Sequence, residues 1–308
     1  EQLTEERIFN YPHTFKLESG QTLPELNICY STYGNFDPSL NNVVWVCHAL
    51  TANSDALDWW SGLFGEGKLF DTSKYFIVCA NVPGSCYGST GPLDINPLTG
   101  EPYYSSFPNF TMRDVVAAFE LLRSYLGINK IHTCIGGSLG GQQALEWVVS
   151  NPELVENLIL MATNARTSPW GIALNKTQRM AIKTDKTWGQ KNVRAGEEGM
   201  KVARAIALLS YRSYETYEKT QEDPVDELEN LRAVTYQQYQ GEKFAKRFNA
   251  YSYWAMTKLL DSHNVGRKRG GVAKALELIK AKTLIIGIKT DVLFPTQEQE
   301  YLHKYIKN

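Results

Sequence analysis

One segment, Gly136-Gly137-Ser138-Leu139-Gly140, limits more than any other how this chain can fold. An apolar run at residues 130–135 precedes it, and a helical pattern at residues 142–147 follows it. A strand, a tight turn and a helix in this order would hold the Ser138 hydroxyl exposed at the turn. The flanking glycines fit this arrangement, because a Cβ there would collide with the neighbouring strand and helix. We therefore predict that Ser138 is a covalent nucleophile, with an inert glycine-rich turn as the alternative.

A nucleophilic serine needs a histidine to accept its proton and a carboxylate to orient that histidine. In α/β-hydrolases, which carry such a serine on a strand–turn–helix elbow, the acid and then the histidine follow the serine along the chain. Asp291 follows an apolar run at residues 283–288 and is the predicted acid, with a turn or helix-capping role as the alternative. His303 lies in a helical pattern, and too few residues follow it for the strand that normally precedes the base. We therefore expect His303 to be a surface residue and the catalytic histidine to lie beyond Asn308.

Composition narrows the function classes. The chain has 308 residues and a net charge of −1, which argues against a nucleic-acid-binding surface. No apolar run approaches the ~18 residues of a membrane span, and residues 1–7 have no signal-peptide core. The cysteines are odd in number and lack a C-x-x-C pair, which predicts reduced thiols in a cytoplasm, without disulfides or a metal site. They are Cys29, Cys47, Cys79, Cys86 and Cys134.

The order of apolar runs predicts an α/β fold. Several runs are continuous, as in parallel strands covered on both faces; they span residues 26–33, 43–47, 75–80, 131–135, 158–162 and 283–288. Thr111 and Asp114 form a capping-box pattern before a helix that Gly127 ends. A helix between two strand runs is typical of a βαβ unit, so a mostly parallel sheet flanked by helices is expected.

The segment 168–271 lacks strand runs and has helical patterns at 174–182, 199–211, 225–240 and 244–261. We interpret it as a helical lid inserted into a core made of residues 1–167 and 272–308; a separate helical domain is the alternative. The basic run at 267–269 is expected to be a solvated turn, with a coenzyme phosphate contact as the minority interpretation.

An oxyanion hole needs two backbone N–H groups. The residue after the nucleophile, Leu139, is the predicted first donor. The second is expected in the loop that follows the apolar run 43–47, which begins His48-Ala49-Leu50-Thr51. His48 precedes the serine in the chain and ends a strand, so a structural role is expected for it.

Six blocks of the chain resemble the homoserine O-acetyltransferase family. They are C-H-A-L-T at 47–51, N-V-P-G-S-C-Y-G-S-T-G-P at 81–92, I-N-P-L-T-G at 95–100, F-P with T-M-R-D at 107–114, G-G-S-L-G-G-Q-Q-A-L-E-W at 136–147, and D-V-L-F-P at 291–295. The resemblance implies an α/β-hydrolase fold with a helical lid and a homodimer formed through the lid helices. It also implies acetyl transfer from acetyl-CoA, a co-substrate, to the hydroxyl of L-homoserine by a ping-pong mechanism in methionine biosynthesis, with no cofactor or metal.

The resemblance also assigns roles to residues. Ser138 is implied as nucleophile, Asp291 as triad acid, and Leu50 and Leu139 as oxyanion donors. Tyr211-Arg212 resembles a lid-borne Y-R pair whose arginine binds the substrate carboxylate, because a guanidinium fork can bind both oxygens.

The chain departs from the family pattern in two places. Leu139 and Gln142 replace methionines, and the terminal G-H-D is absent from the 308 residues. Three groups of alternatives stay open: a serine acceptor or a succinyl donor, an esterase or thioesterase on the same site, and an inactive binding module.

Overall fold

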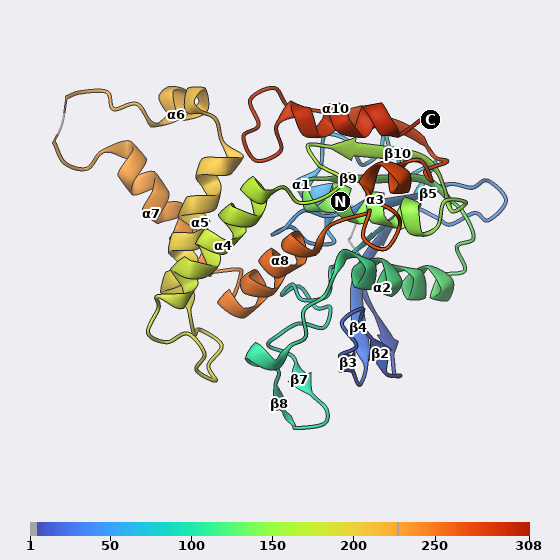
Figure 1. The fold of residues 1–308 in the computed structure, drawn as a ribbon, viewed down its shortest axis with the longest axis horizontal. Helices are drawn as coiled ribbons and strands as arrows, with labels where there is room; N and C mark the ends of the chain where they lie inside the picture. Colours follow the sequence, from blue (N-terminus) through green and yellow to red (C-terminus); the bar gives the residue numbers. More distant parts are fainter. Residues whose placement is uncertain (1–4, 227) are drawn as a thin grey trace.

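The computed structural model describes residues 5–226 and 228–308 (Figure 1). Its centre is a seven-stranded sheet in the order β1-β4-β6-β5-β9-β10-β11. The five strands from β6 to β11 in this order run parallel, whereas β4 is antiparallel to both β6 and β1. The bounds are β1 Glu5–Tyr11, β4 Leu26–Tyr33, β5 Val43–Cys47, β6 Phe76–Ala80, β9 Ile131–Gly137, β10 Val155–Met161 and β11 Lys282–Ile286. Two short hairpins, β2 (Phe15–Lys16) with β3 (Thr22–Leu23) and β7 (Ile95–Asn96) with β8 (Glu101–Pro102), lie outside this sheet.

Helices cover both faces of the sheet, which confirms the expected α/β-hydrolase architecture. All five residues of β5 are buried, and successive side chains point to opposite faces. Trp45 packs in a large core with α2 (Met112–Tyr125) and α3 (Leu139–Ser150), whereas Val44 and Val46 pack with α1 (Ala56–Trp59). Helices α9 (Val272–Leu276) and α10 (Thr296–Tyr305) contribute to the larger core.

Helix α3 is anchored to the sheet by aromatic packing. The Trp45 and Trp147 rings lie 4.8 Å apart, edge to face, and Phe119 of α2 packs 5.6 Å from Trp147. The predicted capping box of α2 is present, because Thr111 accepts the Asp114 N–H and the Asp114 carboxylate accepts the Thr111 N–H. These contacts fix the start of α3, where Ser138 lies.

Residues 168–271, here called the helical insertion, lie between β10 and the last strand, β11. Figure 1 shows its helices projecting to one side of the sheet. They are α4 Pro169–Lys183, α5 Glu197–Tyr211, α6 Tyr214–Gln221, α7 Arg232–Ala245 and α8 Ala250–Ser262.

Two of the helix boundaries predicted for this insertion were wrong. Residues 225–226 and 228–231 are not helical, and the expected helix 244–261 is split because Asn249 caps a new helix by accepting the Ser252 N–H. Helix α6 was not predicted; it buries none of its residues, so it carries no apolar periodicity. No helix in the described ranges is long and apolar enough to cross a membrane.

Candidate active site

Ser138 occupies a strained turn between β9 and α3. Its backbone has φ 53° and ψ −121°, a conformation that few residues other than glycine adopt. A Cβ on Gly136 would lie 2.3 Å from the Gly140 carbonyl, and a Cβ on Gly140 would lie 2.1 Å from the Cys47 carbonyl oxygen. The strand–turn–helix geometry predicted from the glycine pattern is therefore confirmed, and the turn packs directly against the end of β5.

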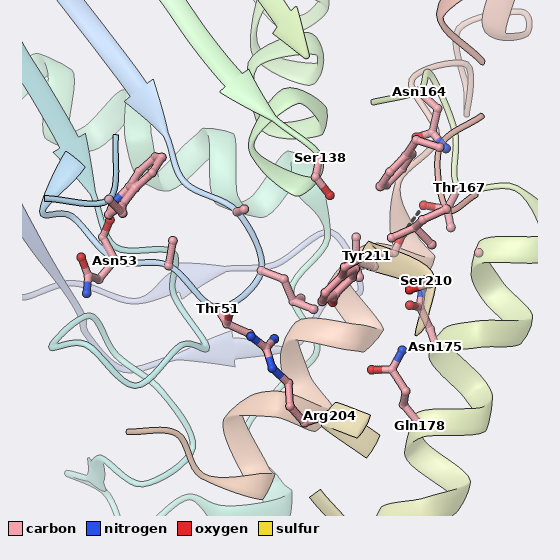
Figure 2. A pocket seen from close by; sticks show the side chains of 18 of the residues that line it. Thr51, Asn53, Ser138, Asn164, Thr167, Asn175, Gln178, Arg204, Ser210 and Tyr211 are labelled. Carbon is pink, nitrogen blue, oxygen red and sulfur yellow. Dashed lines mark hydrogen bonds between the residues drawn. The ribbon is translucent and has the colours of Figure 1, made fainter. Parts of the chain in front are cut away.

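A cavity of about 530 Å³ opens beside Ser138, at the carboxyl ends of the parallel strands. Figure 2 shows the Ser138 hydroxyl directed into this space, with Asn175 and Gln178 reaching in from α4. Leu50 and Thr51, from the loop after β5, form part of the wall. The site is thus enclosed between the sheet and the helical insertion.

The structure places both predicted oxyanion residues next to the elbow. Leu139 is the first residue of α3, so its N–H has no acceptor within the helix. Leu50 lines the cavity, and its loop begins where Cys47 and His48 approach Gly140. A backbone donor at a helix N-terminus, as Leu139 is, suits a developing negative charge.

The loop after β5, residues 48–53, is held by side chains from several elements. Gln143 of α3 donates to the His48 carbonyl (2.9 Å), and Trp59 donates to the Asn53 carbonyl (2.8 Å). From the helical insertion, Arg247 donates to the Thr51 carbonyl (2.5 Å) and to the Tyr87 hydroxyl (2.8 Å). The loop therefore touches both the core and the insertion.

Asp291 follows β11, as predicted, and is half-buried. Its Oδ1 accepts the backbone N–H groups of Leu293 and Phe294 at 2.8 and 2.9 Å, and Oδ2 takes part in neither bond. Burial raises the pKa of the Asp291 carboxyl, and the two backbone N–H groups oppose that rise. Asp291 lines a recess of about 300 Å³ that shares Ser210 and Tyr211 with the main cavity.

The structure places the arginine that was predicted to bind a carboxylate outside the cavity that contains Ser138. Arg212 is exposed at the end of α5 and lines the Asp291 recess, whereas Tyr211 and Arg204 line the cavity that contains Ser138. Arg204 and Tyr211 are seven residues apart and share a helix face, while Arg212 is turned by about 100° from Tyr211. The i, i+7 spacing was the sequence signal that could have identified Arg204.

Arg204 lacks an anionic partner among the described residues. Its guanidinium lies 4.5 Å from the Phe244 ring centre and 5.7 Å from that of Tyr211. Its Nε is buried and makes no hydrogen bond in the described part of the chain. A half-buried guanidinium of this kind is suited to binding a carboxylate.

Histidines do not line the cavity within the described ranges. His303 is exposed on α10, as expected. His48 is fully buried, with Nδ1 2.7 Å from the Ala49 oxygen and Nε2 accepting the Val82 N–H at 2.9 Å. His263 is buried, with Nε2 2.7 Å from the Asn164 oxygen. The structural role predicted for His48 agrees with these contacts.

Both buried histidines should make stability depend on pH. Burial lowers the pKa of His48, and likewise of His263, from 6.5 to about 4. As the pH falls, the unfolded chain therefore binds protons at a higher pH than the folded chain does. The free energy of unfolding that is present above pH 6.5 is lost as the pH falls towards 4. At pH 5 each histidine should lower the free energy of unfolding by about 2 kcal/mol relative to its value well above pH 6.5. The measurement is denaturant titration at both pH values.

The His263→Gln variant tests this assignment, because its amide can still donate to the Asn164 carbonyl but does not titrate. This variant should lose about half of the pH dependence between pH 7.5 and 5. An unchanged slope would contradict the assignment.

The described residues contain no group of three or more His, Cys, Asp or Glu side chains that could hold a metal ion. All five cysteines are free thiols, and burial raises the pKa of Cys86, the least buried of them, to about 12.

Comparisons with known proteins agree with this geometry. Residues 42–308 match the model of the alpha/beta hydrolase fold family. A homoserine O-acetyltransferase of Cyclobacterium marinum is 50% identical over 305 residues, covering 99% of this chain and 87% of that protein.

Solved structures extend the comparison. The crystal structure of a homoserine O-acetyltransferase from Bacillus anthracis has a TM-score of 0.92 and 26% identity, covering 99% of this chain and 88% of that one. Esterase E22 has a TM-score of 0.89 at 24% identity, covering 99% and 90%, a likeness that shows the fold alone. The fold, the elbow and the sequence identity lead to one conclusion: the chain belongs to the homoserine O-acetyltransferase family of α/β-hydrolase-fold enzymes.

Proposed function

We propose that this enzyme transfers an acetyl group from acetyl-CoA to the side-chain hydroxyl of L-homoserine, through an acetyl-Ser138 intermediate. The observation that carries the proposal is that one cavity contains both a strained Ser138 and the Arg204 guanidinium, which has no anionic partner among the described residues. The serine suits acyl transfer, and the guanidinium suits an acceptor with a carboxylate.

The reaction would run in two steps. The Ser138 Oγ attacks the thioester carbonyl, the C–S bond breaks, and the thiol of coenzyme A leaves with a proton. The homoserine hydroxyl then attacks the acetyl carbon, its proton is removed, and the Ser138 oxygen leaves and regains its own. The N–H groups of Leu50 and Leu139 would hold the oxyanion in both steps, which is typically worth ~2.7–4 kcal/mol per donor. The Asp291 carboxylate would orient the histidine base that a nucleophilic serine requires.

The helical insertion would act as the lid of this site. An acyl-serine is open to attack by water, so a transferase must admit an amino-acid alcohol while excluding solvent. The walls that α4 and α5 contribute to the cavity support this role. The core would then comprise residues 1–167 and 272–308.

The test is release of coenzyme A thiol by the purified protein, with and without L-homoserine. Release that requires homoserine, with parallel initial-rate lines, supports acetyl transfer by a ping-pong mechanism. Release without an acceptor favours a thioesterase, and intersecting lines indicate a ternary complex. The same assay is carried out with serine as acceptor and with succinyl-CoA as donor. Small differences in a pocket discriminate between such similar substrates only weakly, by ~1–3 kcal/mol.

Arg204 should bind the acceptor rather than the donor. Replacing Arg204 by Ala should lower kcat/KM for homoserine by about 10²-fold, because charge-assisted hydrogen bonds to the carboxylate are lost. The rate of Ser138 acetylation, followed by intact protein mass, should change little. Arg212→Ala is the matched control from the same helix and should have a small effect. The reverse ranking of the two variants would restore Arg212 as the binding residue.

We also propose that the enzyme is a homodimer formed through the helical insertion. Val202 and Leu209 of α5 are 54% and 59% exposed and lie seven residues apart on one helix face. Val234 and Tyr239 on the neighbouring α7 are exposed as well. Val202→Glu with Leu209→Glu should yield a monomer by light scattering. The matched control is Leu98→Glu in the turn between β7 and β8. A monomeric wild-type protein would refute the proposal.

We place the enzyme in the cytoplasm, in the biosynthesis of methionine. Five free thiols suit a reducing compartment. The products expected from the reaction, an O-acylated amino acid and free coenzyme A, belong to intermediary metabolism.

A further inference from the structure

The proposed second oxyanion donor, the Leu50 N–H, belongs to a peptide group whose carbonyl oxygen, that of Ala49, is held by hydrogen bonds. The Leu50 N–H and the Ala49 C=O form one planar peptide unit, and in a trans peptide they point in opposite directions. No cis peptide is present in the described part of the chain. Any group that fixes the Ala49 carbonyl therefore also aims the Leu50 N–H.

The His48 ring is placed to fix that carbonyl. Its Nε2 lies 2.9 Å from the Val82 nitrogen, a backbone N–H that can only donate, so Nε2 carries no proton. In the neutral ring the proton must then be on Nδ1, which lies 2.7 Å from the Ala49 oxygen and donates to it. The Ala52 N–H donates to the same oxygen at 3.2 Å.

The same residue is tied to the helix that begins at the nucleophile. Gln143, on the first turns of α3, donates to the His48 carbonyl at 2.9 Å. A Cβ on Gly140 would lie 3.2 Å from the His48 carbonyl carbon, so the two backbones are in close approach. His48 thus connects β6, through Val82, with the elbow and with the 49–50 peptide.

We propose that His48 is a positioning residue, whose Nδ1–H bond to the Ala49 carbonyl aims the Leu50 N–H at the oxyanion. This role rests on the proposed function, in which Leu50 is an oxyanion donor. Two effects act together. The bond removes a rotation of the peptide plane, and a hydrogen bond accepted by a carbonyl polarises the amide, which strengthens its N–H as a donor.

Two variants distinguish the roles of the two His48 ring nitrogens, Nδ1 and Nε2. In His48→Asn the amide nitrogen replaces Nδ1 and can still donate to the Ala49 carbonyl. In His48→Gln the amide oxygen replaces Nε2 and can still accept from Val82, but the donor to Ala49 is lost. The readout is the rate at which a fluorophosphonate probe labels Ser138, because phosphylation needs the oxyanion hole but neither acetyl-CoA nor homoserine.

His48→Gln should label about 10- to 100-fold more slowly than wild type. This loss is smaller than the ~10²- to 10³-fold loss that follows removal of an oxyanion donor, because the donor is misdirected and not removed. His48→Asn should label within a few-fold of wild type. Equal rates in the two variants would overturn the proposal, since a purely structural role does not distinguish the two ring nitrogens. If wild-type Ser138 accepts the probe but acetyl-CoA does not acylate it, the acetyl transfer fails while this comparison still decides the role of His48.

A second measurement needs no variant. Nitrogen-15 NMR of the histidine rings of the wild-type protein should show His48 as the neutral, Nδ1-protonated tautomer. An Nε2-protonated or doubly protonated ring at pH 7 would overturn the proposal even if both variants fail to fold.

Discussion

Ser138→Ala should reduce homoserine-dependent release of coenzyme A by about 10⁴- to 10⁶-fold. The hydroxyl is the only group of this residue that can form the acyl intermediate, and the alanine methyl fits the same turn. The φ of 53° imposed on residue 138 is costly for either side chain, so stability should change little. The measurement is thiol release, paired with intact mass, which should show an acetyl adduct in the wild type and none in the variant.

A matched serine supplies the control for this loss. Ser73 is exposed and lies just before β6, at the amino end of a parallel strand and thus at the edge of the sheet opposite the elbow. Ser73→Ala should retain full activity. An adduct that persists in Ser138→Ala would assign the nucleophile to another residue.

Asp291→Asn should lower kcat by about 10⁴-fold, as removal of the orienting carboxylate does in other serine triads. The asparagine oxygen can keep the two bonds from the Leu293 and Phe294 N–H groups, so the local turn should survive. The amide nitrogen then takes the place of Oδ2 and presents a donor, which favours the wrong tautomer of a facing imidazole. The measurement is kcat together with the rate of Ser138 acetylation.

Asp37→Asn is the control for this substitution, since Asp37 also accepts from a nearby backbone N–H, that of Ser39, but lies far along the chain from the site. It should leave kcat unchanged. Activity in Asp291→Asn close to that of wild type would return Asp291 to a purely structural role as a turn residue.

Much of the sheet could be predicted because several of its strands, such as β4, β5 and β6, are almost entirely buried. The runs at 26–33 and 43–47 coincide with β4 and β5, and the run at 158–162 overlaps β10, which spans Val155–Met161. Continuous apolar runs mark strands that are covered on both faces. The helical insertion was harder to predict, because α6 buries no residue and α7 begins only at Arg232. A helix without an apolar stripe leaves no periodic signal in the sequence.

The candidate site, like the fold, could be predicted only in part. The placement of Ser138 and Asp291 after strands could be predicted from their positions in the chain. Which of Arg204 and Arg212 lines the cavity beside Ser138 could not be predicted, because it depends on the rotation of α5 against the core. Only the packed structure places Arg204 over Phe244 and leaves Arg212 at the surface.

The contact between Arg247 and Thr51 has a consequence for the timing of the reaction. Arg247 lies between α7 and α8, and it holds the carbonyl of the residue that follows Leu50. Any outward motion of the insertion that moves Arg247 would break this bond and release the loop that carries Leu50, the proposed oxyanion donor. Entry of large substrates and full catalytic competence would then exclude each other. An enzyme coupled in this way wastes little thioester, because each acyl-transfer step becomes efficient only once the site has closed around the substrate of that step.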